Sequence, residues 1–262
     1  MIVTVTNTVI HFSGVPLQLA RELDARTAPS VKGHRYNRAF QQGLWDGREH
    51  MVKRQRDGTF AVPVGLLPDL LELASEWELA AEIVDARAEA HESAIEVDWN
   101  PDWKLRPYQR EAVEAATSGV ESLTGGKGLL RLPTRSGKTV IAAGVIDALK
   151  VRTLFLVQSE MLLAQTISLF LTVLRVPIGQ AGSGKWDIQD ITVASCQTLT
   201  RRAGKPEVAD LLDSVNLVIF DECHHLEGKK WRELLASIDA RYKLGLSATI
   251  YFDTDGETPK GS

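Results

Sequence analysis

Long apolar runs, a leader segment and a cysteine framework are all absent from this sequence. No stretch reaches the roughly 18 consecutive apolar residues that a membrane-spanning helix needs. The first residues, Met-Ile-Val-Thr-Val-Thr, lack the basic and apolar regions of a secretory leader. The cysteines are Cys196 and Cys223, too few for a disulfide scaffold. We therefore expect a protein of the reducing cytoplasm, with no membrane partner.

The composition is that of an ordinary globular protein, which excludes the disordered and fibrous classes. Of the 262 residues, 44% are hydrophobic and 24% are charged, close to average usage. At roughly 100 to 200 residues per domain, the chain has room for two domains.

Charge is distributed unevenly around a net value of −4. Between Val31 and Arg56, seven Lys and Arg residues accompany two acids, a local net charge of +5. From Asp69 to Asp98, ten acids accompany Arg87 alone, a local net charge of −9. A basic segment can bind a phosphate backbone whatever the total charge, because salt screens fields beyond about 10 Å. A solvated surface without a nucleic-acid partner is the alternative for this segment.

Residues 1–90 are predicted to form a small α+β domain, because short apolar alternations and one amphipathic pattern follow one another. The expected elements are a strand or short hairpin over 2–12, a helix from Pro16, a hairpin over 51–64 with its turn at Asp57-Gly58, a helix over 66–77 and a strand over 79–84. The polar, acidic residues 91–103 are typical of a linker.

Residues 104–262 are predicted to form an α/β domain. Short apolar strands alternate there with helical patterns, which favours a parallel sheet covered on both faces. The predicted strands are 128–132, 152–157, 191–194, 217–220 and 242–246. Ligands of such folds bind at the carboxyl ends of the strands.

The first of these strands leads into a candidate phosphate loop. Its sequence is Pro133-Thr134-Arg135-Ser136-Gly137-Lys138-Thr139, and a helical pattern follows. A loop between a strand and a helix N-terminus turns backbone N–H groups toward one point, where the helix dipole favours an anion. Lys138 is placed for the β- and γ-phosphates of ATP, and the Thr139 hydroxyl for Mg²⁺. Leu132 stands where the strict pattern has glycine, so a chance Ser-Gly-Lys-Thr is the alternative.

The strand 217–220 ends in Asp221-Glu222-Cys223-His224-His225. An acidic pair at a strand end is the expected partner of a phosphate loop. Asp221 would then bind Mg²⁺ through water, and Glu222 would orient and deprotonate the attacking water. One alternative is an acidic surface turn. A zinc site at Cys223, His224 and His225 is another, although adjacent side chains converge poorly on one ion.

These motifs and several others occur in the order found in superfamily 2 helicases, which the sequence resembles. The matching segments are Leu105 to Gln109 (Q-motif), Pro133 to Thr139 (motif I), Phe155 to Gln165 (motif Ia), Ile191 to Leu199 (a later DNA-contacting motif), Asp221 to His224 (motif II) and Ser247 to Thr249 (motif III). Together they cover residues 104–249. Arg135 departs from the family, many members of which have a small residue there.

The resemblance implies an ATP- and Mg²⁺-dependent helicase whose 104–262 domain is RecA-like. The implied catalytic residues are Lys138, Asp221, Glu222 and His224. The implied nucleotide contacts are Arg106, Tyr108, Gln109 and residues Thr134 to Thr139, with Gln109 reading the adenine edge and Thr139 and Asp221 holding Mg²⁺. Ser247 and Thr249 would couple the nucleotide to DNA movement. The implied phosphate contacts of the DNA are Gln158, Ser159, Ser195, Gln197 and Thr198.

The N-terminal region also resembles known helicases, but less closely. Trp45 to Arg48, the hairpin after it and Gly65-Leu66-Leu67 are similar to the start of UvsW-type phage helicases and their XPB-like relatives. This implies DNA contacts by Arg48, Lys53 and Arg54, with Trp45 as a stacking surface. The alternative for Trp45 is a place in the core. Double-stranded or branched DNA is the expected partner, RNA is not excluded, and the expected location is the cytoplasm of a bacterial or phage-infected cell.

The chain ends thirteen residues after Thr249. The resemblance implies a second RecA-like domain that supplies an arginine finger, and we expect it to be missing here or to belong to a separate chain. Loss of such a finger lowers phosphoryl-transfer rates by about 10³ to 10⁵, so weak hydrolysis is expected. The leading hypothesis is an ATP-dependent DNA helicase or translocase. The alternatives are the motor of a restriction or nuclease complex and a non-enzymatic, DNA-binding regulatory fragment.

Overall fold

The computed structural model describes residues 1–31, 33–87, 94–118, 126–222, 234 and 238–248. The chain divides after Arg87 into two compact units. None of the helices in these ranges has the length and apolar character needed to cross a bilayer.

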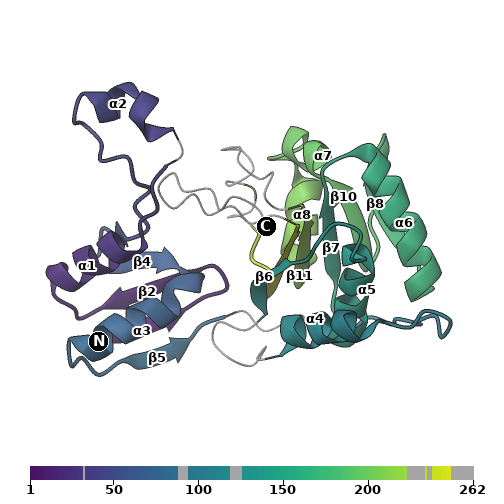
Figure 1. Ribbon diagram of the computed structural model, residues 1–262, viewed down its shortest axis with the longest axis horizontal. Helices are drawn as coiled ribbons and strands as arrows, with labels where there is room; N and C mark the ends of the chain where they lie inside the picture. Colours follow the sequence, from purple (N-terminus) through teal and green to yellow (C-terminus); the bar gives the residue numbers. More distant parts are fainter. Residues whose placement is uncertain (32, 88–93, 119–125, 223–233, 235–237, 249–262) are drawn as a thin grey trace, which may run out of the picture. The chain divides into compact units, whose positions relative to one another are not determined.

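The first unit is a five-stranded sheet with two main helices (Figure 1). Its elements are β1 (Ile2–Val5), β2 (Val9–Ser13), α1 (Leu17–Thr27), η1 (His34–Tyr36), α2 (Arg38–Gln41), β3 (Lys53–Arg54), β4 (Phe60–Pro63), η2 (Val64–Leu66), α3 (Leu67–Glu76) and β5 (Glu82–Asp85). The strand order is β3-β4-β2-β1-β5; β1 and β5 are parallel and the other pairs antiparallel. Residues 2–12 form a hairpin, the second of the two predicted forms, and the predicted hairpin over 51–64, both helices and the last strand are present.

The core of this unit follows from the alternation in its strands. Val3 and Val5 of β1 and Ile10 and Phe12 of β2 are buried, and the residues between them are more exposed. The helices contribute fully buried leucines to the same unit, namely Leu19 and Leu23 of α1 and Leu70 and Leu73 of α3. An α+β packing of this kind needs one apolar face per element.

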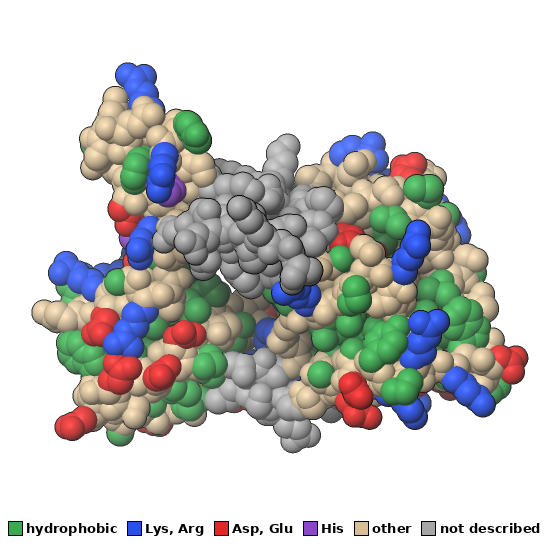
Figure 2. All heavy atoms as spheres, in the orientation of Figure 1, with side chains coloured by type: hydrophobic (Ala, Val, Ile, Leu, Met, Phe, Trp, Pro, Cys, Tyr) green, Lys and Arg blue, Asp and Glu red, His purple; other side chains and the backbone are tan. Residues whose placement is uncertain are grey.

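An excursion between α1 and β3 was not predicted. Its two ends pair with each other: the Val31 amide donates to the Gly47 carbonyl at 2.7 Å, and the Glu49 amide to the Pro29 carbonyl at 2.9 Å. We call residues 29–49 the arm; it carries η1 and α2, which lie away from the sheet of their unit (Figure 1). Lys and Arg side chains cover part of the arm's surface (Figure 2).

The second unit contains a seven-stranded sheet. Its elements are α4 (Pro107–Thr117), β6 (Lys127–Arg131), α5 (Lys138–Leu149), β7 (Thr153–Val157), α6 (Glu160–Leu174), β8 (Ile178–Gly182), β9 (Lys185–Asp187), β10 (Ile191–Ser195), α7 (Cys196–Arg201), α8 (Pro206–Ser214), β11 (Leu217–Asp221) and β12 (Tyr242–Ser247). The order is β6-β12-β11-β7-β10-β8-β9, and every neighbouring pair is parallel except β8 and β9.

Helices cover both faces of this sheet, as predicted. In β7, Phe155 and Val157 pack into one apolar cluster with α4, α5 and α6, whereas Leu154 and Leu156 pack into a second with α7 and α8. A strand buried on both faces is apolar at nearly every position, which explains why the sequence revealed the central strands. Parallel pairing also brings the carboxyl ends of β6, β11, β7 and β10 to one edge of the sheet.

Two features of the second unit differ from the sequence prediction. The hairpin β8–β9 was not predicted; its turn has Ser183 and Gly184 at φ 51° and 78°, typical of a tight two-residue turn. The predicted linker 91–103 is also different, because its described part, 94–103, packs on the second unit. There Ile95 is buried, and the Asn100 amide donates to the Val173 carbonyl at 2.8 Å.

The arm is tied to α1 by a histidine between two carboxylates. His50 Nδ1 lies 2.5 Å from Asp24 Oδ2, and His50 Nε2 lies 3.2 Å from Asp46 Oδ2. The other oxygen of Asp24 accepts hydrogen bonds from the Met51 and Val52 amides at 2.8 and 2.9 Å. Hydrogen bonding to Asp24, and the charges of Asp24 and Asp46, raise the pKa of His50 above its usual value.

This arrangement predicts a pH-dependent stability for the first unit. Because the folded pKa of His50 is raised, its stabilisation is complete below the unfolded value of about 6.5 and is lost as pH rises through the folded pKa. We expect the urea midpoint to fall modestly over that interval, since the exposed ring is screened by water. His50→Gln should flatten this dependence; an equal pH dependence in the variant would assign the effect to another group.

Candidate functional site

The phosphate loop lies between β6 and α5, where the sequence predicted it. Gly137, the residue before α5, has φ 77°, and a Cβ there would lie 2.7 Å from Gln109 Nε2. Glycine therefore meets both a conformational and a steric requirement. Because Gly137 has no side chain to cap α5, the helix N-terminus can offer its N–H groups to an anion.

Two side chains of α4 hold this loop through one carbonyl. The Ser136 carbonyl accepts hydrogen bonds from the Tyr108 hydroxyl at 2.8 Å and from Gln109 Nε2 at 3.0 Å. Gln109 is buried, and its Oε1 accepts from the Arg106 amide at 2.9 Å. Both ends of the Gln109 amide are thus engaged within the protein. One N–H and one lone pair of this amide are not used by these two bonds, and the reading of an adenine edge by Gln109 stays a prediction.

The acidic pair ends β11, two strands away from β6 in the sheet. The Glu222 amide donates to Asp221 Oδ1 at 3.1 Å, and Glu222 Oε1 lies 3.0 Å from Lys138 Nζ. The side chains of Lys138 and Glu222 are only 10% and 27% exposed, so water screens this ion pair little. The structure therefore brings the phosphate loop and the acidic pair together, with β12 between their strands.

Electrostatics at this edge favour a cation next to the acids. Burial and the neighbouring Glu222 carboxylate raise the pKa of Asp221, and the charge of Lys138 opposes this shift. A bound divalent cation would offset both the cost of burying the charged Asp221 carboxylate and its repulsion from Glu222.

Burial also raises the pKa of Cys196 to about 12, and the charge of Asp221 adds to this effect. The Cys196 thiol is therefore neither a nucleophile nor a thiolate ligand at neutral pH.

The strand of motif III is hydrogen-bonded to Leu132, the residue that precedes the phosphate loop. Ser247, the last residue of β12, is buried, and its carbonyl accepts a hydrogen bond from the Leu132 amide at 2.9 Å. The motifs gave no signal for this contact, because it joins backbone groups.

Thr139 lies half-buried in the first turn of α5. The predicted roles of His224 and Thr249, and the zinc alternative at residues 223–225, lie outside the described residues.

The residues predicted to contact DNA in the second unit follow β7 and β10, at the same edge as Asp221. Ser159 caps α6 and accepts from the Leu162 amide at 3.3 Å, and Gln197 is exposed. Ser195 and Thr198 are buried. Their side chains are covered in this conformation, and the phosphate contacts of Ser195 and Thr198 stay a prediction. Gln158 Nε2 and Thr198 Oγ1 are buried with no hydrogen-bond partner among the described residues.

The predicted DNA contacts of the first unit lie on its surface. Lys53 and Arg54 form the exposed strand β3. Arg48 is also exposed, although its guanidinium donates to the Ala25 carbonyl at 3.2 Å. Trp45 is half-buried in the arm, where its indole donates to the Arg48 carbonyl at 2.8 Å. It lies outside the buried core, so the core alternative for Trp45 is wrong.

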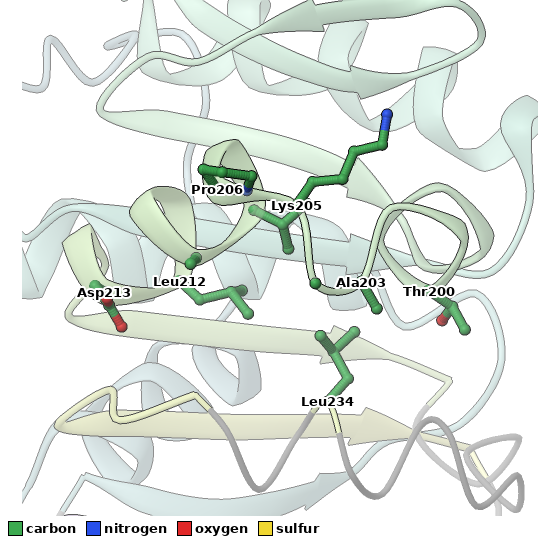
Figure 3. Close-up of a pocket in the computed structure, with 10 residues that line it drawn as sticks. Thr200, Ala203, Lys205, Pro206, Leu212, Asp213 and Leu234 are labelled. Atoms are coloured by element: carbon green, nitrogen blue, oxygen red, sulfur yellow. The ribbon is translucent and has the colours of Figure 1, made fainter.

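A hollow of about 640 Å³ opens beside α7 and α8 (Figure 3). Ala203, Leu212 and Leu234 line it, and Lys205 lies at its rim. None of the residues predicted for the nucleotide or DNA site contributes to it. The chemistry at the carboxyl edge of the sheet is therefore separate from this hollow.

Two non-glycine residues at the nucleotide site have a left-handed backbone. Arg135 has φ 64° and Glu222 has φ 50°. This conformation costs about 1 to 2 kcal/mol for a residue with a Cβ. The sequence signal was Arg135 itself, a large residue where the family motif usually has a small one.

Comparison with known proteins agrees with this geometry. Residues 102–252 match the family described as type III restriction enzyme, res subunit. The DNA 3'-5' helicase XPB of Kineococcus radiotolerans is 32% identical over 187 residues, which are 69% of this chain and 31% of that protein. The DNA 3'-5' translocase XPB2 of Sulfurisphaera tokodaii is 31% identical over 68% of this chain and 40% of that protein. The chain thus spans well under half the length of these relatives.

Solved structures show the same fold. A crystal structure of the UvsW helicase from bacteriophage T4 has a TM-score of 0.67 at 20% identity, covering 95% of this chain and 93% of that one. A second T4 UvsW structure has a TM-score of 0.68 at 21% identity, covering 95% and 53%. The predicted α/β fold with a RecA-like parallel sheet and the resemblance to superfamily 2 helicases are confirmed.

The raised pKa of Asp221 predicts that this residue destabilises the fold at neutral pH. An acid whose folded pKa is raised opposes folding once it ionises, so Asp221→Asn should raise the thermal midpoint at pH 7. We expect about 2 to 4 °C, the shift that ~1 kcal/mol produces in a chain of this size. The gain should shrink as pH falls toward the ordinary Asp value of 3.8.

Scanning calorimetry of the second unit's transition at several pH values measures this effect. Asp210→Asn, which changes an exposed carboxylate on α8, is the matched control and should leave the midpoint unchanged. A lower midpoint for Asp221→Asn at pH 7 would contradict the prediction.

Proposed function

We propose that this chain, which belongs to the type III restriction enzyme res-subunit family, is the ATP-binding part of an ATP-dependent DNA helicase or translocase. Its relatives named as DNA 3'-5' helicase and DNA 3'-5' translocase support this assignment. The observation that carries it is the ion pair between Lys138 and Glu222, which joins the phosphate loop to the acidic pair. The location that we propose is the cytoplasm of a bacterial or phage-infected cell.

The chain's own residues fit a magnesium nucleotide. The uncapped N-terminus of α5 and the N–H groups of the loop would hold the β- and γ-phosphates. Lys138 would exchange part of its contact with Glu222 for the γ-phosphate. Thr139 and Asp221 would hold Mg²⁺, and the raised pKa of Asp221 is the observation that fits a cation there. The ion would supply neutralisation of charge on the phosphate oxygens.

Glu222 would act as the base once Lys138 turns to the phosphates. In this structure its carboxylate is paired with the Lys138 ammonium at 3.0 Å. Nucleotide binding would weaken that pair, so Glu222 could orient the attacking water and accept its proton. The contact between the Ser247 carbonyl and the Leu132 amide would pass changes at the loop to the strand of motif III.

Lys138→Ala is predicted to lower Mg-ATP affinity at least tenfold, because a charge-assisted hydrogen bond to phosphate is lost. Glu222→Gln should keep the affinity within about threefold and lower hydrolysis by about 10² or more. Calorimetric titration gives the affinities, and phosphate release gives the rates. Lys185→Ala, on the edge strand β9, is the matched lysine control and should match the unchanged protein. Unaltered affinity in Lys138→Ala would remove the basis of the proposal.

DNA binding by the first unit is predicted to depend steeply on salt. Neutralising each phosphate contributes about 0.9 to the slope of log affinity against log salt. Lys53→Ala with Arg54→Ala should therefore lower that slope by about 1 to 2 in a fluorescence anisotropy titration. Arg21→Ala changes an exposed arginine of α1 in the same unit and should leave the slope unchanged. Equal slopes for the double variant and the unchanged protein would favour the solvated-surface alternative.

The description of the matched family favours a second candidate, the motor of a restriction or nuclease complex. Both candidates use the same nucleotide chemistry, and a nuclease segment elsewhere in the assembly would separate them. A third reading, a regulatory DNA-binding fragment, predicts that the ATP pocket is silent. Hydrolysis by residues 1–262 should be slow in all three cases, because the family resemblance places the arginine finger in a second RecA-like domain. Supplying that domain should restore DNA-stimulated hydrolysis only for an active motor.

A further inference from the structure

Most non-glycine residues with positive φ in the described part of the chain have a simple local reason. Three follow helix ends and one lies in a hairpin turn, namely Glu78, Lys150 and Arg175 after α3, α5 and α6, and Ser183 between β8 and β9. A residue with positive φ commonly follows the end of a helix, and tight hairpin turns commonly contain one. Arg135 and Glu222 remain, and both lie at the nucleotide site.

Arg135 occupies a turn position that glycine normally fills. The Ser136 amide donates to the Pro133 carbonyl at 3.3 Å, which closes a turn with Arg135 as its third residue. A turn with positive φ only at that position favours glycine. The Glu222 side chain forms an ion pair with Lys138, so this residue has an internal contact that can offset its strained conformation. The exposed Arg135 side chain makes no hydrogen bond or ion pair with any residue that the structure describes.

The conformation of Arg135 is imposed by its neighbours. The Ser136 carbonyl is held by Tyr108 and Gln109, and the Leu132 amide is held by the Ser247 carbonyl. The loop is therefore fixed on both sides of Arg135 in the absence of a nucleotide. A fixed backbone gives the long side chain a defined origin, which lowers the entropy lost when its guanidinium binds a ligand.

The cations around the loop differ in how far they are already engaged. Lys138 is paired with Glu222, and the Arg106 guanidinium donates to the Tyr108 hydroxyl at 3.4 Å. Arg135 is exposed and unengaged, and a guanidinium fork matches the geometry of phosphate oxygens. An arginine at a position that favours glycine, whose side chain has no partner among the described residues, points to a ligand contact.

We propose that the Arg135 guanidinium binds the phosphate chain of the nucleotide as a second cation beside Lys138. The inference rests on the proposed function and adds to it a residue that sets nucleotide affinity. Arg135 then favours nucleotides in proportion to their phosphate charge. Its contribution is greatest for ATP, smaller for ADP and smallest for AMP.

Three substitutions separate the charge of Arg135 from its backbone conformation. Arg135→Asn and Arg135→Gly remove the charge but tolerate positive φ, and Arg135→Lys keeps a cation. In calorimetric titrations with the magnesium complexes, Asn and Gly should weaken ATP binding about tenfold and AMP binding least. Lys should restore part of the loss. The thermal midpoints of the Asn and Gly variants should equal or exceed that of the unchanged protein, because strain is relieved.

The same titrations contain the outcomes that would overturn the inference. Unchanged ATP affinity in both the Asn and Gly variants would show that Arg135 contacts no phosphate of the nucleotide. Weaker binding together with a lower thermal midpoint would assign it a structural role in the loop. Weaker DNA binding with unchanged ATP binding would place its contact on DNA.

Failure of the proposed function gives a different pattern. If the unchanged protein binds no ATP, or if Lys138→Ala binds as well as it does, the proposed function and the Arg135 inference fall together. If Lys138→Ala loses affinity and the neutral Arg135 variants do not, only the Arg135 inference falls.

Discussion

The ion pair between Lys138 and Glu222 is the interaction that joins the two halves of the nucleotide site. Each side chain is held at a strand or helix terminus, Lys138 at the start of α5 and Glu222 just after β11. The two groups meet at 3.0 Å with little exposure to water. A buried ammonium without a partner is costly, so each charge stabilises the other while no phosphate is present. The same pairing keeps the base occupied until a phosphate competes for Lys138.

The shape of the loop is set by neighbouring elements and does not depend on a nucleotide. Tyr108 and Gln109 of α4 fix the Ser136 carbonyl, and Ser247 of β12 fixes the Leu132 amide. Such preorganisation reduces the ordering that binding would otherwise require. Because of these hydrogen bonds, a displacement of the loop would also act on α4 and β12. The Q-motif and motif III are therefore mechanically connected to the phosphate site through two carbonyl groups.

Strands buried on both faces could be predicted from the sequence, because nearly every position is apolar. Thr153–Val157 and Leu217–Asp221 are of this kind, and their ends placed the acidic pair correctly. The hairpin β8–β9 escaped prediction because glycine interrupts its apolar pattern at Gly179 and Gly182. The segment 94–103 was misread because its acidic composition hid Ile95, whose burial depends on tertiary contacts. The partners of Gln109 could not be predicted, since a side-chain amide bonds whichever group the fold brings near.

Several features that lower the stability of the fold lie at the edge of the sheet where the motifs meet. Asp221 is half-buried beside a second carboxylate, and Arg135 and Glu222 both have left-handed backbones. Each feature opposes folding, and a sequence selected for stability alone would replace them with asparagine, glycine or an apolar residue. A cation between the acids and a phosphate against the loop would relieve the electrostatic part of these costs. The backbone strain at Arg135 is held by the hydrogen bonds of its neighbours, and a contact made by its guanidinium would add to them.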